Sequence, residues 1–137
     1  MSDIKLKAVI AGAVVDNVAT LFLMMLLMTA LASQGISQEE VVAKLKTPSG
    51  QLLSLIIGLG CTCLGGYVAG RMSRQSEVLH GAVVAGAGMV LALILRESGL
   101  PNWYDIIGFA CMLPAGMLGG RAAGQRRKSG DDGKGKD

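Results

Sequence analysis

Residues 8–32 read AVIAGAVVDNVATLFLMMLLMTALA, an apolar run that contains one charged residue, Asp16. As an α-helix this run extends over roughly 37 Å, which is more than the roughly 30 Å hydrocarbon core of a bilayer. We therefore predict an all-α integral membrane protein, with a four-transmembrane-helix bundle in residues 1–120. The other three predicted spans are residues 52–70, 78–95 and 103–120.

The composition excludes most classes of soluble protein. Hydrophobic residues make up 51% of the 137 residues, and charged residues make up only 17%, against about 25% in a typical soluble domain. The three cysteines lie inside the apolar runs, which argues against a secreted disulfide scaffold and favours their packing as small apolar side chains.

Catalytic motifs are missing from the sequence. It contains no nucleophile paired with a base, no pair of carboxylates at a catalytic spacing and no phosphate-binding loop. A single His and a single acid deep in a span are too few groups for most enzymes. We expect the chain not to be an enzyme, and we expect neither a metal site nor a cofactor.

The distribution of Lys and Arg predicts the orientation of the chain in the membrane. With the N-terminus inside, all 13 Lys and Arg lie on the cytoplasmic side except Lys44, Lys46 and Arg96. Residues 121–137 are polar and basic, and we expect them to form a disordered cytoplasmic tail. Residues 30–32 resemble a signal-peptide cleavage site, but the run before them is longer than the roughly 7–15 apolar residues of a signal peptide. We therefore expect a retained first span and two cytoplasmic termini.

Two segments 50 residues apart resemble each other. Residues 56–71, IIGLGCTCLGGYVAGR, align without gaps to residues 106–121, IIGFACMLPAGMLGGR, with seven of 16 positions identical. Residues 12–15 and 81–84 both read GAVV. We interpret this pattern as a duplicated helical hairpin, which gives a parallel repeat because each copy contains two spans. Chance similarity between glycine-rich spans is the alternative.

Small residues recur four positions apart in the apolar runs, which places them on one ridge of a helix. In lipid, helices are held together by close van der Waals packing and interhelical hydrogen bonds, and rows of small residues permit that close approach. We predict Gly/small-xxx-Gly packing, either within the bundle or at a homodimer seam. The residues predicted to pack are Gly12, Gly58, Thr62, Gly66, Gly70, Gly81, Gly108, Gly116 and Gly120.

Asp16, Asn17 and His80 form the candidate intramembrane polar site. Asp16 shares a helix row with Gly12 and Thr20, so we expect it to face other helices and not lipid. A carboxylate within a span is a candidate ion, proton or solute site. The alternative is that Asp16 only joins helices through a hydrogen bond. His80 lies at the start of the third span. It is a candidate for a proton relay, and the alternative is that it is an ordinary hydrogen-bonded group.

Basic residues follow the predicted cytoplasmic ends of the even-numbered spans. We expect them to anchor these ends at the inner leaflet, where anionic lipids are the predicted partners. A second copy of the chain or another membrane protein is a further expected partner, whereas nucleic acid is not, because no binding fold or aromatic interleaving accompanies the charges. The predicted anchors are Arg71, Arg74, Arg121, Arg126, Arg127 and Lys128.

Some features of the sequence resemble a known kind of protein. The GxxxGR ends at 66–71 and 116–121, together with His80-Gly81 at the start of the third span, resemble uncharacterised four-span, glycine-rich bacterial inner-membrane proteins with a duplicated helical hairpin. The resemblance implies a multi-pass protein of the bacterial inner membrane and supplies no activity.

The sequence favours a structural role, or a role accessory to a membrane partner, because groups for chemistry are scarce. The alternative is an oligomeric ion, proton or small-solute channel or transporter centred on Asp16. The two hypotheses differ in one respect, since only the second requires the carboxylate of Asp16 for flux.

The topology is testable with reporter fusions. A reporter fused after Asp137 should be active on the cytoplasmic side, and a reporter inserted at Gln38 should be active on the external side, because the basic residues hold their loops inside. Termini on opposite sides of the membrane, or a mature chain that begins at Ser33, would contradict the four-span prediction.

Overall fold

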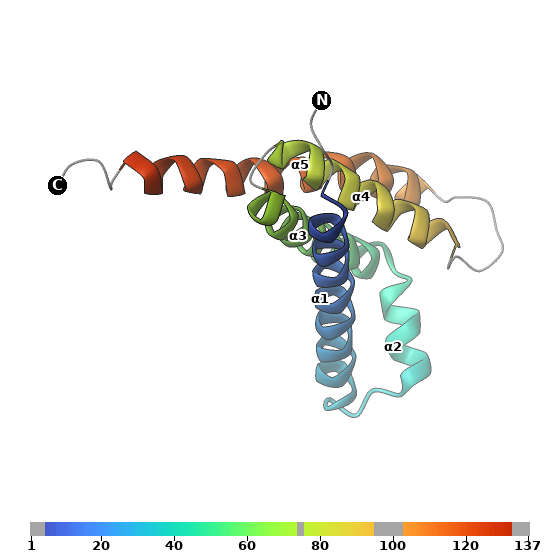
Figure 1. Cartoon of the computed structure of the whole chain (residues 1–137). Helices are drawn as coiled ribbons and strands as arrows, with labels where there is room; N and C mark the ends of the chain where they lie inside the picture. Colours follow the sequence, from blue (N-terminus) through green and yellow to red (C-terminus); the bar gives the residue numbers. More distant parts are fainter. Residues whose placement is uncertain (1–4, 74–75, 95–102, 133–137) are drawn as a thin grey trace.

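A computed structural model describes residues 5–73, 76–94 and 103–132, and within these residues the chain is entirely helical, without strands (Figure 1). Its four long helices coincide with the four predicted spans, and a short helix lies between the first two of them. The helices are α1 (Leu6–Ala32), α2 (Gln38–Leu45), α3 (Pro48–Ser73), α4 (Glu77–Ile94) and α5 (Trp103–Asp132).

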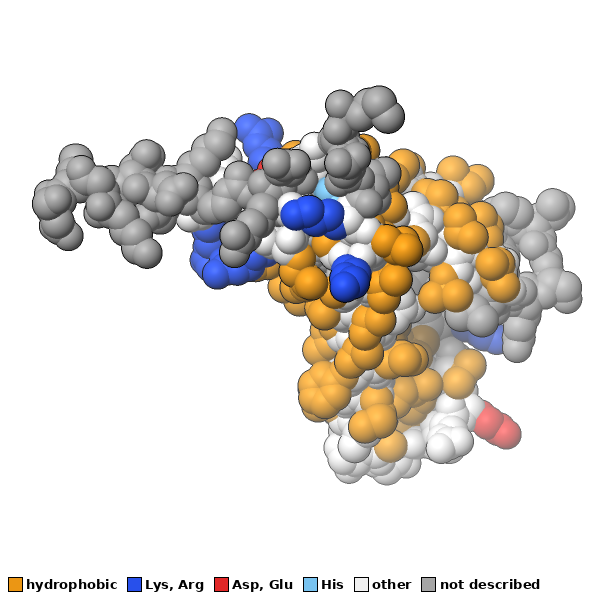
Figure 2. All heavy atoms as spheres, viewed as in Figure 1, with side chains coloured by type: hydrophobic (Ala, Val, Ile, Leu, Met, Phe, Trp, Pro, Cys, Tyr) orange, Lys and Arg blue, Asp and Glu red, His pale blue; other side chains and the backbone are white. Residues whose placement is uncertain are grey.

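The four long helices confirm the predicted number of spans. The four candidate spans are 18 to 27 residues long, and each contains an 18-residue window with a mean hydropathy between 1.4 and 2.0, which is long and apolar enough to cross a membrane. Large apolar side chains point outward, with Leu21 72% exposed and Phe22 60% exposed. Apolar side chains also cover much of the face drawn in Figure 2. Such a surface suits lipid and not water, as expected of a multi-pass membrane protein.

The connection between the first two spans contains the short helix α2. The Ser37 side chain accepts a hydrogen bond from the amide of Glu40, and the Glu40 side chain accepts one from the amide of Ser37. This capping box satisfies two amides at the start of the helix. Gly35, with φ of 75°, turns the chain between α1 and α2. Pro48 opens α3 at a position where a missing amide hydrogen costs nothing.

The last helix is longer than the predicted span. α5 begins at Trp103, as expected, but it continues to Asp132 and so includes most of the segment expected to lack regular structure. Ala, Gln, Arg and Lys between residues 121 and 128 all have high helix propensity, and they prolong a helix that is already nucleated.

The third helix is central to the bundle. α3 contacts α1, α4 and α5, whereas within the described residues α1 contacts α4 but not α5. In Figure 1, α1 runs downward while α4 and α5 run sideways, so the helices converge near the start of α1 and separate away from it. We call the converging end, where α1 begins and α3 ends, the terminal end, and the opposite one the α2 end.

Glycines stand at the closest helix contacts of the terminal end. A Cβ atom on Gly12 would lie 2.6 Å from the carbonyl oxygen of Gly65, and one on Gly66 would overlap the carbonyl oxygen of Gly116. One on Gly81 would also overlap the carbonyl oxygen of Gly116. A side chain at any of these positions would therefore collide with the backbone of the neighbouring helix.

Within the four long helices, the buried residues are confined to the terminal end. Among the described residues of the four long helices, the buried ones extend no further than Asp16 in α1 and Ala85 in α4, and they begin only at Cys61 in α3 and Gly116 in α5. The other half of each helix contains only exposed and half-buried residues. The bundle is thus closed at the terminal end and open at the α2 end.

Two glycines of α3 provide a matched test of this packing. Gly66→Ala should lower the stability of the protein in detergent by about 1 to 3 kcal/mol, because its methyl group meets the Gly116 backbone. Gly60→Ala should raise it by about 0.5 to 1 kcal/mol, because no atom lies within 4 Å of the added methyl and Ala favours the helix. Denaturant unfolding measures both, and equal effects would contradict the packing.

Candidate functional site

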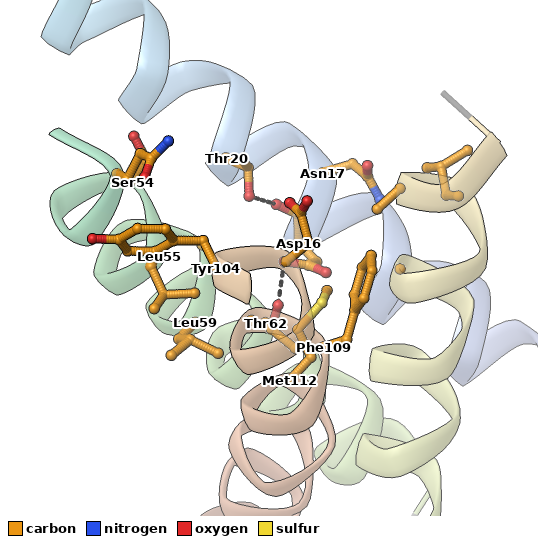
Figure 3. Close-up of a pocket in the computed structure, with 17 residues that line it drawn as sticks. Asp16, Asn17, Thr20, Ser54, Leu55, Leu59, Thr62, Tyr104, Phe109 and Met112 are labelled. Atoms are coloured by element: carbon orange, nitrogen blue, oxygen red, sulfur yellow. Dashed lines mark hydrogen bonds between the residues drawn. The ribbon is translucent and has the colours of Figure 1, made fainter. Parts of the chain in front are cut away.

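A cavity of about 540 Å³ lies between α1, α3, α4 and α5 in the open half of the bundle (Figure 3). Its inner end is at Asp16, where burial begins, and its lining continues to residues near the start of α3 and α5. The lining residues are Asp16, Asn17, Thr20, Gln51, Ser54, Leu55, Gly58, Leu59, Thr62, Gly88, Leu91, Ala92, Tyr104, Asp105, Gly108, Phe109 and Met112.

Asp16 is the last buried residue of α1, with only 6% of its surface exposed. Its Oδ1 accepts a hydrogen bond from the Thr62 hydroxyl of α3 at 3.4 Å (Figure 3). Within the described part of the chain, no Lys, Arg or His side chain pairs with this carboxylate. Placing a carboxylate at membrane depth without a partner costs free energy. The open cavity beside Asp16 has room for such a partner.

Close helix packing brings Asp16 to Thr62 and leaves room on its other side. A Cβ atom on Gly65 would lie 2.8 Å from the Cβ of Asp16, so α3 touches α1 directly there. On the other side, a Cβ on Gly88 of α4 would lie 3.4 Å from Oδ2 of Asp16 and 3.3 Å from Cε of Met112. The absence of a side chain at Gly88 therefore keeps the space next to the carboxylate open.

Two polar side chains next to Asp16 are held by their own helix. Asn17 donates its side-chain amide to the carbonyl of Ala13 at 2.8 Å, and the Thr20 hydroxyl donates to the carbonyl of Asp16 at 2.8 Å. Both side chains line the cavity, so the structure brings Asn17 to Asp16 as the sequence suggests. These local hydrogen bonds fix the two side chains without using the Asp16 carboxylate.

The remaining wall combines apolar and aromatic surface with a polar outer end. Phe109 and Met112 of α5 lie beside Asp16 in Figure 3, and Tyr104 lies nearer the start of α3. The Tyr104 hydroxyl donates to the carbonyl of Pro48 at 3.4 Å, which joins the first turns of α3 and α5. Asp105 adds a second carboxylate to the lining.

His80 lies outside this cavity. It is fully buried at the terminal end, where Nε2 accepts a hydrogen bond from the backbone amide of Lys5 at 3.0 Å. Because Nε2 accepts, the ring proton is on Nδ1, which donates to the carbonyl of Ser76 at 3.0 Å. His80 thus connects the first turns of α1 and α4 and does not contact the Asp16 carboxylate.

Basic side chains occupy the terminal end of the bundle. Arg71, Arg121 and Arg126 are exposed there, and Arg71 donates to the Tyr67 hydroxyl at 3.2 Å. Figure 2 shows Lys and Arg side chains gathered around this end. Of the other predicted anchors, Arg127 and Lys128 lie on α5, whereas Arg74 is outside the described residues.

The predicted packing glycines divide into two groups. Five of them meet a neighbouring helix so closely that a Cβ would collide, and a Cβ on Gly70 would be tight, at 3.0 Å from the Cα of Gly120. A Cβ on Gly108 would meet only the side chain of Leu55, at 3.2 Å. Gly58 has no atom within 4 Å of an added Cβ and lines the cavity instead. The five are Gly12, Gly66, Gly81, Gly116 and Gly120.

Several site residues were not singled out from the sequence. Gly65, Gly88, Gly119 and Phe109 lie at helix contacts or in the cavity wall, but none of them was among the residues predicted to pack or to form the polar site. The sequence did contain a signal for two of them. Gly65 and Gly119 each lie on a row of small residues four apart and are each followed by a second glycine, and adjacent positions on a helix face two different neighbours.

Comparison with protein-family models, curated proteins and solved structures found no match for this chain. The fold and the cavity therefore define its class on their own terms. Within the described residues, its regular secondary structure is all helical, four helices are long and apolar enough to span a membrane, and the cavity ends on the buried carboxylate of Asp16.

The link between Asp16 and Thr62 is testable with two isosteric changes. Thr62→Val should lower stability by about 0.6 kcal/mol, a typical value for an interhelical hydrogen bond in a membrane. Thr20→Val is the control, because its hydroxyl binds its own helix. In an Asp16→Ala background the effect of Thr62→Val should vanish. Unfolding measurements that give additive effects would argue against the hydrogen bond.

Proposed function

We propose that the chain is a membrane transporter that binds a small solute or ion at Asp16. The observation that carries the proposal is the cavity of about 540 Å³ that ends on this buried carboxylate. Among the described side chains, the Asp16 carboxylate accepts a hydrogen bond from the Thr62 hydroxyl. It therefore retains lone pairs that can accept a proton, an ion or a donor group of a solute. The cavity gives such a ligand access from one end.

The packing favours a carrier over an open channel. Beyond Asp16 the helices close at Gly12, Gly65 and Val84, where helix backbones and small side chains are in contact. A continuous pore would need space along this part of the bundle as well. A ligand taken up at the α2 end therefore stops at Asp16, and its release at the terminal end requires the helices to move.

The proposed orientation follows the basic residues. We place both termini in the cytoplasm of a bacterial inner membrane, which is supported by the exposed Lys5, Lys7, Arg71, Arg121 and Arg126 at the terminal end. Anionic lipids of the inner leaflet are the proposed partners of this surface. The cavity then opens toward the outside of the cell.

We also propose that the bundle is a parallel hairpin repeat packed through its glycines. Gly66 and Gly116 are equivalent in the sequence repeat, and an added Cβ on the first would meet the backbone of the second. A Cβ on Gly70 would likewise lie 3.0 Å from the Cα of its equivalent, Gly120. Contacts between equivalent positions are expected when α3 and α5 lie side by side in the same direction.

A flux assay in proteoliposomes tests the proposed function and separates it from a structural or accessory role. The parent protein should transport at least one of three probes, which are protons, Na⁺ and radiolabelled benzylammonium. Asp16→Asn should reduce this flux to that of protein-free vesicles, because the amide cannot carry the charge, and Asp16→Glu should retain part of it.

The matched control is Glu39→Gln, which makes the same change of acid to amide at an exposed position on α2, away from the cavity. It should transport like the parent. An accessory protein would instead give no flux of any probe, or equal flux with and without the Asp16 carboxylate, and either result would overturn the transporter proposal.

A further inference from the structure

We propose that the ligand of the Asp16 cavity is an organic ammonium ion with an apolar substituent. The inference rests on the proposed function, since it assigns a chemical class to the substrate of the same site. Three properties of the cavity support it, namely its charge, its size and the composition of its wall.

The charge of the lining selects a cation. The wall contains the Asp16 carboxylate, and none of the described lining residues is Lys, Arg or His. Asp16 lies at the inner end, with its Oδ1 on Thr62 and its Oδ2 facing the space that Gly88 leaves free. An anion would be repelled there, and a neutral solute would leave a buried carboxylate unpaired.

The donors of a primary ammonium group match the acceptors at this end. Such a group has three N–H donors and no acceptor. The Asp16 carboxylate, the Thr62 hydroxyl oxygen and the Asn17 amide oxygen are acceptors in the lining. A charge-assisted hydrogen bond to the carboxylate is about twice as strong as a neutral one, so Asp16 is the main anchor.

The size and wall of the cavity distinguish an organic from an inorganic cation. A volume of about 540 Å³ is in the range of small-molecule sites, whereas a metal cation needs a close shell of oxygen ligands. Leu59, Phe109 and Met112 contribute apolar surface next to the carboxylate. The Phe109 ring attracts a cation through its π face, and the apolar groups bury the substituent.

Saturable binding of radiolabelled benzylammonium to the purified, full-length protein in mild detergent tests the inference. Unlabelled benzylammonium should displace the label, whereas benzyl alcohol and benzoate, which match its shape but are neutral and anionic, should not. Na⁺ at equal concentration should not displace it either. Absence of saturable binding to the folded parent, or displacement by benzyl alcohol, would overturn the ammonium assignment.

Variants locate the bound ion. Asp16→Asn should weaken binding by about 30-fold or more, as loss of one partner of a buried charge pair does, and Asp16→Glu should restore part of it. Phe109→Leu should weaken binding by about two- to fivefold. Circular dichroism and gel filtration confirm that each variant is folded. Unchanged affinity in a folded Asp16→Asn protein would overturn the inference.

Two glycines of α4 supply a matched pair for the position of the ammonium group. Gly88→Ala places a methyl group 3.4 Å from Oδ2 of Asp16 and should weaken binding by about fivefold or more. Gly86→Ala adds the same methyl where nothing lies within 4 Å and should bind like the parent. Equal affinities of the two variants would show that the ion does not occupy the space beside Gly88.

The flux and binding experiments fail in different ways. Asp16-dependent flux of protons or Na⁺ without binding of benzylammonium would uphold the transporter and overturn the ammonium ligand. Binding that depends on Asp16 without flux of any probe would uphold the ligand and overturn the transporter, leaving a membrane receptor for ammonium ions.

Discussion

The architecture depends on the close approach of backbones at Gly65 and Gly66 in α3. Adjacent helix positions point about 100° apart, so the first glycine meets α1 at Gly12 and the second meets α5 at Gly116. α3 thereby contacts α1 and α5 at distances that a side chain at either glycine would increase. In lipid no hydrophobic effect draws helices together, so in a membrane this contact area would supply much of the attraction between the helices.

Tight packing at one end determines the shape of the other. Helices that cross closely at the terminal end diverge beyond it. In the α2 half the side chains do not fill the space between the diverging helices, and the cavity remains there. Asp16 lies at the boundary between the two halves, where Thr62 supplies a hydrogen bond and the cavity supplies room. A carboxylate deeper in the closed half would lack that room, and one further along α1 would approach lipid.

The sequence predicted the elements better than their arrangement. Apolar length identified the four spans, because the hydropathy of a segment is a local signal. Asp16 was recognised as a candidate because charge is rare in a span. Periodicity could not show that Gly58 lines a cavity while Gly65 packs, since both lie on glycine-rich faces and only the crossing point of the helices distinguishes them.

The crossing point also determines how the proposed carrier would change state. In the proposed carrier, access from the terminal end would require α1 to separate from α3 at Gly12 and Gly65, where the contact is between helix backbones and small side chains. Such contacts are individually weak and permit sliding. The described hydrogen bond between the side chains of these two helices joins Asp16 to Thr62. In the proposed carrier, a cation bound at Oδ2 would share the carboxylate whose Oδ1 accepts this bond, so ligand binding and helix separation would act on the same side chain.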